Sequence, residues 1–220
     1  MSTITEQSIE QGQSRSKAWV VKLYNFWNIH FSNRFIWRCP NQHIINLYNS
    51  NITDNHLDIG VGAGYYLKHC KWQPNTLLSL LDINTNNLNI ANNKLKHLNP
   101  TRYQADIYKP QTFLKGKFNS ISITYLLHCL PGDMRAKTSA IKHCSDMLKE
   151  GGTLFGATII SNNKHHNSLS KSLINFYNEK GMFSNEFDSV QALAHALNRC
   201  LDKVIIETHG CVALFKAIKY

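Results

Sequence analysis

The stretch that decides the fold is His56-Leu57-Asp58-Ile59-Gly60-Val61-Gly62-Ala63-Gly64-Tyr65. A short, mostly apolar run is followed by three glycines that alternate with small residues, and a helix-like pattern begins after them. This order predicts a strand, a tight turn and a helix. Glycine at all three positions removes the side chains from one side of the turn, so another molecule can approach the backbone closely. Taken alone, the turn is compatible with a nucleotide-type ligand or with a purely structural connection.

Beyond residue 55 the chain alternates between strand-like and helix-like segments. Apolar runs predict strands over residues 56–59, 76–81, 102–105, 118–124 and 153–159. Helical spacing of apolar residues lies between them, over residues 65–71, 85–97 and 133–148. The turn Glu150-Gly151-Gly152 is expected to end the last of these helices. Strands that alternate with helices favour a parallel sheet covered on both faces.

The last third of the chain predicts a different ending for this sheet. Helical patterns over residues 169–180 and 189–201 precede two strand-like runs, 203–208 and 211–218. Because only His209-Gly210 separates these runs, we expect an antiparallel hairpin. The sequence therefore predicts an α/β fold whose parallel sheet ends in an antiparallel pair.

The N-terminal region differs in composition from the rest of the chain. Residues 1–16 are rich in Ser, Gln and Glu and predict a loose tail, whereas residues 17–40 are rich in aromatic side chains. Four apolar residues recur there near helical spacing: Trp19, Leu23, Phe26 and Trp27. They predict an amphipathic helix that either packs on the main domain or closes as a lid over a pocket.

A second helix is expected over residues 41–48, because Pro40 is well placed at a helix start. We therefore divide the chain into a tail with a helical, aromatic lid (residues 1–50) and one main domain (residues 51–220). A chain of 220 residues is long enough for such a domain to bury a substantial core.

Composition excludes several classes of protein. A run of about 18 apolar residues, as a membrane-spanning helix requires, is absent from the sequence. The polar start, Met1 to Lys17, does not match a secretory signal, so we expect a cytoplasmic protein. The six cysteines form no Cys-x-x-Cys pair, which predicts reduced thiols and no metal site. The net charge of +10 comes from scattered Lys and Arg residues, which favours a basic solvated surface over a nucleic-acid interface.

Three acids stand at the ends of successive predicted strands. Asp58 ends the first strand, Asp82 the second and Asp106 the third. In an open parallel sheet, ligands bind at the carboxyl ends of the strands, so these acids are expected to surround one site. Asp82 follows Gly64 by 18 residues, near the spacing at which a carboxylate binds both hydroxyls of a ribose.

With these motifs in order, the sequence resembles the class I S-adenosylmethionine-dependent methyltransferases. The segment Asp58-x-Gly60-x-Gly62-x-Gly64 is similar to the first motif of that family, and Asp82 and Asp106 match acids at the ends of its second and third strands. Leu148-Lys149-Glu150-Gly151-Gly152 resembles the turn before its fifth strand. The resemblance covers roughly residues 52–220. It implies a Rossmann-like three-layer α/β/α sandwich around a mostly parallel seven-stranded sheet with a C-terminal antiparallel hairpin.

The resemblance also implies S-adenosylmethionine as the cofactor and a role for each matched residue. The backbone of Gly60, Gly62 and Gly64 would lie against the methionine and ribose portions, and Asp58 would act near the amino group. Asp82 would accept hydrogen bonds from the ribose hydroxyls, and Asp106 would hold the adenine amino group. The remaining cofactor contacts would come from Ile83, Ile107 and Thr124.

Two residues after the fourth strand are the candidates for catalysis. Tyr125 would stand between cofactor and acceptor, and His128 is the one candidate base that the motifs offer. The alternative for His128 is a structural histidine whose hydrogen bonds are satisfied in a loop or at a helix start.

The sequence excludes some acceptors better than it selects one. Thr124-Tyr125-Leu126-Leu127 lacks the Asn/Asp-Pro-Pro pattern of adenine or glutamine N-methylation, and the surroundings of Cys129 do not match cytosine C5 chemistry. A compact domain with an aromatic N-terminus favours a small-molecule acceptor, methylated on oxygen or nitrogen, without a membrane partner. Whether the protein is a monomer or a homodimer stays open.

Three alternatives also stay open. One is an RNA or protein methyltransferase that uses the basic surface, and another is a non-catalytic protein that binds S-adenosylmethionine. The third is a nicotinamide-dependent dehydrogenase, but its Gly-x-Gly-x-x-Gly spacing differs from the spacing of Gly60, Gly62 and Gly64.

Overall fold

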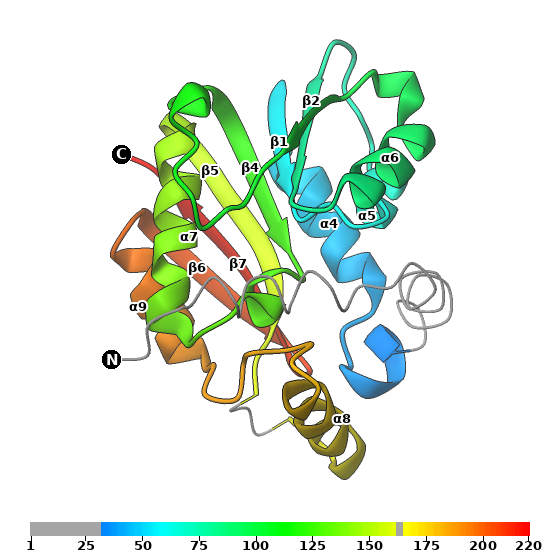
Figure 1. The fold of residues 1–220 in the computed structure, drawn as a ribbon, viewed down its shortest axis with the longest axis vertical. Helices are drawn as coiled ribbons and strands as arrows, with labels where there is room; N and C mark the ends of the chain where they lie inside the picture. The colour runs from blue at the N-terminus through cyan, green and yellow to red at the C-terminus, as the bar shows by residue number, and fades with distance from the viewer. Residues whose placement is uncertain (1–31, 162–164) are drawn as a thin grey trace.

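A single sheet organises residues 32–161 and 165–220, the part of the chain that the computed structural model describes (Figure 1). Its seven strands lie in the order β3-β2-β1-β4-β5-β7-β6. They are β1 (Asn55–Ile59), β2 (Leu77–Asp82), β3 (Thr101–Gln104), β4 (Phe118–Thr124), β5 (Leu148–Ile159), β6 (Asp202–His209) and β7 (Val212–Ile218). Strands β1 to β5 are parallel, and β7 runs antiparallel to both β5 and β6. The predicted Rossmann-like sheet with its C-terminal hairpin is confirmed.

Helices cover both faces of this sheet (Figure 1). The described helices are α4 (Asn41–Asn51), α5 (Tyr65–His69), α6 (Thr85–Lys94), α7 (Met134–Met147), α8 (Ser168–Glu179) and α9 (Val190–Asn198), of which α8 lies beyond one end of the sheet in Figure 1. Short helical turns occupy Ser32–Ile36, Lys96–Leu98, Thr112–Leu114 and Leu127–Cys129. Among the described residues, no helix is both long enough and apolar enough to span a membrane.

Alternation along the strands explains the two apolar cores. Leu57 and Ile59 of β1 pack into the core beneath α7 and α9, whereas Leu78 and Leu80 of β2 pack into the core beneath α4, α5 and α6. Successive side chains of a strand point to opposite faces, so one sheet supplies apolar residues to both cores. The three-layer arrangement therefore follows from strands that are buried on both faces, although one face of β1 and β4 carries the buried polar side chains His56, Asp58, Ser120 and Ser122.

The start of β5 differs from the prediction. The sequence predicts a helix that ends at Gly151-Gly152 and a strand from residue 153, but α7 ends at Met147 and β5 begins at Leu148. Leu148 pairs with Phe118 of β4, and the register of the two strands shifts between Phe118 and Ser120. This long-range pairing extends the strand through the two glycines, which a local turn signal does not reveal.

The N-terminal predictions have different outcomes. The second predicted helix is α4, which continues to Asn51 and lies against α5 and β5. The amphipathic helix expected around Trp19–Trp27 lies outside the described residues. The boundary near residue 50 between a lid and the main domain stays a prediction.

A buried ion pair attaches the segment before α9 to α7. Lys137 Nζ of α7 lies 2.7 Å from Asp188 Oδ2 and donates to the carbonyl oxygen of Ser184 at 2.6 Å. Both charged side chains are almost fully buried, and burial lowers the pKa of Lys137 and raises the pKa of Asp188. Each charge therefore depends on its partner to offset the loss of water.

Substituting Lys137→Met is expected to lower the free energy of unfolding by about 3–5 kcal/mol, because Asp188 would stay buried without its cation. Urea denaturation measures this loss. The matched control is Lys142→Met on the same helix, whose pair with Asp146 is exposed and should contribute less than about 1 kcal/mol. Equal losses of free energy of unfolding in the two variants would show that the buried ion pair contributes no more to stability than the exposed pair.

Candidate functional site

The glycine turn between β1 and α5 uses backbone conformations that other residues rarely adopt. Gly60, Gly62 and Gly64 have φ angles of +71°, +52° and +67°. A Cβ atom at Gly60 would lie 2.8 Å from the side chain of Leu126, and one at Gly64 would lie 3.2 Å from Ala91. At Gly62 no described atom lies within 4 Å of that position. Two of the glycines therefore permit close packing, and the third borders open space.

Asp82 lies directly beside this turn, at the end of β2. Its Oδ1 accepts from the backbone of Asn84 at 2.8 Å, and its Oδ2 accepts from the backbone of Gly62 at 3.3 Å and from Asn87 Nδ2 at 3.2 Å. Burial raises the pKa of Asp82, and these three hydrogen bonds act in the opposite direction. An ionised carboxylate accepts about four hydrogen bonds, so Asp82 retains capacity for a ligand.

A cleft opens between Asp82 and the end of β3, and we call it the acidic cleft. Its walls include four predicted cofactor residues: Asp82, Ile83, Asp106 and Ile107. Asp106 is half-buried and accepts from the backbone of Tyr108 at 2.9 Å, whereas Ile107 is buried. Gly60 and Gly62 form the end of the cleft nearest to β1.

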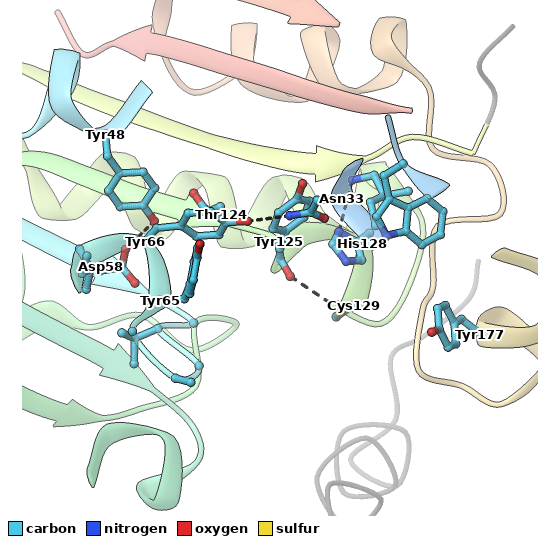
Figure 2. A pocket seen from close by; sticks show the side chains of 18 residues that line it. Asn33, Tyr48, Asp58, Tyr65, Tyr66, Thr124, Tyr125, His128, Cys129 and Tyr177 are labelled. Carbon is cyan, nitrogen blue, oxygen red and sulfur yellow. Dashed lines mark hydrogen bonds between the residues drawn. The ribbon is translucent and has the colours of Figure 1, made fainter. Parts of the chain in front are cut away.

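A second cavity, the aromatic pocket, shares Gly60 and Gly62 with the acidic cleft. Figure 2 shows the side chains that line this pocket. It contains the other predicted site residues: Asp58, Gly64, Thr124, Tyr125 and His128. Aromatic rings supply much of its wall: Trp37, Tyr48, Tyr65, Tyr66 and Tyr177. Gly60, Gly62 and Cys129 border both cavities. Every predicted site residue thus lines one of two adjoining spaces, while the assigned roles stay predictions.

Asp58 presents its two carboxylate oxygens to different surroundings. Oδ2 accepts from the Tyr48 hydroxyl at 2.8 Å and from Ser122 Oγ at 2.5 Å. Oδ1 accepts no hydrogen bond from the residues that the structure describes, and Asp58 borders the aromatic pocket. Burial raises the pKa of Asp58 from its ordinary 3.8 to about 6, while both hydrogen bonds lower it and the charge of Asp82 raises it further.

His128 is buried in the turn after β4. Its Nδ1 accepts from the backbone N–H of Ile159 at 3.3 Å and lies 3.4 Å from Thr158 Oγ1. Because a backbone N–H only donates, Nδ1 is unprotonated and the neutral ring carries its proton on Nε2. Burial, with a further contribution from the charge of Lys137, lowers the pKa of His128 to about 3. His128 is therefore a neutral hydrogen-bond donor and a weak base.

Tyr125 joins β4 to this turn in an unusual conformation. Its φ is +55°, and its backbone N–H donates to Ala157 at 2.7 Å. Within residues 32–161 and 165–220, the buried hydroxyls of Tyr125 and Thr124 have no hydrogen-bond partner within 3.5 Å, although Tyr66 and Cys39 lie close to the first and Tyr48 lies close to the second. Buried polar atoms without partners are rare in native proteins and are explained by a ligand or by water.

Sequence reasoning missed several polar and aromatic members of the site. Asn33 Nδ2 donates to Asn41 Oδ1 at 2.6 Å and to the Tyr66 hydroxyl at 2.9 Å, which links three segments along one wall. Tyr66 lies two residues after Gly64, so its position in the sequence is a usable signal. Tyr48 had no such signal, because only the packing of α4 brings it to Asp58.

Comparisons with known proteins place this geometry in context. Residues 57–154 match a family model described as a methyltransferase domain. The chain is 40% identical over 193 residues to the putative uncharacterized protein YbcY of Escherichia coli (strain K12), covering 84% of this chain and 96% of that one. It is 34% identical over 212 residues to the physcion biosynthesis cluster O-methyltransferase of Aspergillus chevalieri, covering 96% of each chain.

A solved structure resembles the fold over nearly the whole chain. It is the N-methyltransferase NodS from Bradyrhizobium japonicum WM9 in complex with S-adenosyl-L-homocysteine, with a TM-score of 0.61 and 18% sequence identity. The match covers 97% of both chains.

Asp58→Asn is expected to stabilise the free protein at pH 7 and to have almost no effect below about pH 4. Between these values the folded state binds more protons at Asp58 than the unfolded chain does, so the wild type loses stability as the pH rises from about 4 to 6. At pH 7 the gain should be about 2–3 kcal/mol, because each unit of pKa shift is worth about 1.4 kcal/mol. Urea denaturation at both pH values measures it, with the exposed Asp54→Asn as control. A change in the free energy of unfolding that is the same at both pH values would contradict the raised pKa of Asp58.

Proposed function

Because the chain belongs to the class I S-adenosylmethionine-dependent methyltransferases, we propose that it transfers the cofactor's methyl group to an oxygen of a small, uncharged acceptor. One observation carries this proposal: the acidic cleft and the aromatic pocket meet at Gly60 and Gly62. With its adenosine portion in the cleft, the cofactor would reach past the glycine turn to Asp58 at the edge of the aromatic pocket, where the rest of that pocket is open to an acceptor.

The residues of the site fit this cofactor. Gly62 borders open space that a side chain would fill, and Asp82 retains acceptor capacity for ribose hydroxyls. Asp58 Oδ1 is available to an ammonium group, and the unpartnered hydroxyls of Thr124 and Tyr125 border the same pocket. Ile83 and Ile107 offer apolar walls to an adenine ring in the acidic cleft.

S-adenosylmethionine would supply an electrophilic methyl group and leave as S-adenosylhomocysteine, and the hydroxyl proton of the acceptor would pass to water. The protein therefore mainly has to align the acceptor. Alignment of two reactants contributes on the order of 7–11 kcal/mol to such a reaction. We assign this alignment to the aromatic walls of the pocket together with Tyr125 and His128. The Nε2–H of His128 makes no hydrogen bond to the described residues and is available to an acceptor oxygen.

The lining of the aromatic pocket supports a small and uncharged acceptor. Among its described residues Asp58 is the only charged one, and no Lys or Arg is present. Rings of Trp37, Tyr66 and Tyr177 suit a planar, apolar molecule. RNA would require cations at the pocket to contact phosphates, and a protein acceptor would require an open groove. The O-methyltransferase name of the Aspergillus chevalieri relative supports oxygen as the acceptor atom.

The proposal is tested by incubating the purified protein with S-adenosylmethionine labelled in its methyl group and a panel of phenols, enols and amines. Mass spectrometry should detect a labelled methyl on a hydroxyl-bearing compound. Labelled amines alone would assign nitrogen as the acceptor atom instead. Binding of the cofactor without any labelled product, from the panel or from a metabolite extract, would support the non-catalytic alternative.

Asp82→Ala is expected to weaken binding of S-adenosylhomocysteine by about 100-fold, because hydrogen bonds to a charged acceptor contribute about 1.5–3 kcal/mol each. Isothermal titration calorimetry measures the loss, with the exposed Asp54→Ala as the matched control. NAD should give no heat with the wild type. An unchanged affinity in Asp82→Ala would show that this carboxylate does not contact the ribose.

His128→Ala is expected to lower kcat/KM for the acceptor by about 10- to 100-fold, since a misaligned acceptor reacts slowly, and to leave cofactor affinity nearly unchanged. The variant His128→Gln keeps an amide N–H near the place of Nε2 and should recover part of the rate. Steady-state kinetics and calorimetry separate the two effects. If turnover were unaltered in His128→Ala, this residue would be purely structural.

A further inference from the structure

A continuous line of hydrogen bonds runs inside the sheet, from the amino end of β1 to Asp58. Thr53 Oγ1 donates to Ser120 Oγ at 2.9 Å, and Ser120 Oγ lies 2.8 Å from His56 Nδ1. On the far side of the imidazole, Nε2 lies 3.0 Å from Ser122 Oγ, which donates to Asp58 Oδ2 at 2.5 Å. The proposed function makes no use of the first three members of this line.

The ionised Asp58 at one end of the line determines the direction of the donors next to it. The backbone N–H of Thr53, which only donates, also contacts Ser120 Oγ at 3.1 Å. An ionised Asp58 only accepts, so the hydroxyl hydrogen of Ser122 points to it. Ser122 Oγ must then accept from His56, which puts the imidazole proton on Nε2. In this tautomer Nδ1 accepts from the Ser120 hydroxyl, so the donors of His56 and Ser122 point towards Asp58, while the Ser120 backbone near the ring acts to raise the pKa of His56.

Burial keeps this arrangement from exchanging with water. His56, Ser120 and Ser122 are 0% exposed, and the imidazole stacks on Phe155 with ring centroids 5.6 Å apart. Burial lowers the pKa of His56 to about 3, so the ring is neutral over the physiological range. A neutral ring in a single tautomer can hold the Ser122 hydroxyl in one orientation.

The groups that face Asp58 come from every element around it. Tyr48 of α4 donates to it, Ser122 of β4 donates to it, and the charge of Asp82 at the end of β2 opposes its ionisation. Burial raises the pKa of Cys70, after α5, and the nearby charge of Asp58 raises it further. No cation contributes to the pKa of Asp58 among the described residues. Its charge therefore depends on the two hydroxyl donors.

We propose that His56 is a positioning residue, which orients the Ser122 hydroxyl onto Asp58 and thereby sets the pH range in which Asp58 binds the cofactor's ammonium group. The inference rests on the proposed function, in which Asp58 faces that ammonium group. Without the Nε2–H, Ser122 Oγ loses its donor and its hydroxyl is free to turn away. The carboxylate then keeps only Tyr48 as a donor and ionises at a higher pH.

The test is the pH dependence of S-adenosylhomocysteine binding to the full-length protein, measured by calorimetry between pH 5.5 and pH 9. In the wild type, affinity should fall as the pH drops towards 6 and Asp58 becomes protonated. In His56→Leu and Ser122→Ala the midpoint should move up by about one pH unit, and the affinities should approach the wild-type value at high pH. His56→Gln, which retains an N–H donor, should restore the wild-type midpoint.

Ser120→Ala is the matched control. It removes the same hydroxyl from the same buried strand and from the same imidazole, but it leaves the contact to Asp58 in place. Its midpoint should move by less than half as much as that of Ser122→Ala. Equal shifts in the two serine variants, or a wild-type midpoint in His56→Leu, would overturn the proposal, because a merely structural role predicts lower stability without a shifted midpoint.

A second measurement separates this proposal from the proposed function. Carbon-13 NMR of carboxyl-labelled Asp follows the titration of Asp58 in the free protein, with Asp58→Asn providing the assignment. An upward shift of about one unit in His56→Leu supports the positioning role even if the wild type binds no adenosyl ligand. An unshifted titration overturns the role even if the cofactor binds.

Discussion

The left-handed backbone of Gly60, Gly62 and Gly64 is the constraint on which the rest of the site depends. The N–H of Gly60 donates to the carbonyl of Leu81 at 2.8 Å, which ties the turn to β2 and brings Asp82 beside Gly62. Leu126 packs so closely against Gly60 that a Cβ atom there would lie 2.8 Å from its side chain. The same turn therefore lies between the two cavities, and the backbone of Gly60 and Gly62 lines both of them.

The site holds polar groups that cost stability in the free protein. Asp58, His56 and His128 are buried. Burial raises the pKa of Asp58 and lowers the pKa of both histidines, which favours the neutral form of each. Each has hydrogen-bond partners, but the partners of Asp58 satisfy only one of its oxygens. Such a carboxyl is better suited to a cationic ligand than to the stability of the fold. Asp58 is the only charged residue among the described residues of the aromatic pocket, so the remaining wall of that pocket favours an uncharged, apolar molecule.

Local patterns predicted most of the sheet but not where long-range pairing begins. The bounds predicted for β4 match those of the structure, because its alternation is set by the strand's own residues. The predicted start of β5 is wrong by five residues, because the pairing of Leu148 with Phe118 continues the strand through Gly151 and Gly152. The sequence also predicted that the candidate site residues lie close together, since the carboxyl ends of parallel strands meet at one edge of a sheet.

The sequence by itself determined the glycine turn, the acids at the strand ends and the order of strands and helices. These features are local, because glycine's freedom and the spacing of apolar residues act over a few positions. Only the tertiary structure decided that Tyr48 and Ser122 hold Asp58, that His56 lies between Ser120 and Ser122, and that His128 carries its proton on Nε2. These contacts join residues from different elements, up to 66 positions apart. Packing decides such contacts, and no periodicity in the chain encodes them.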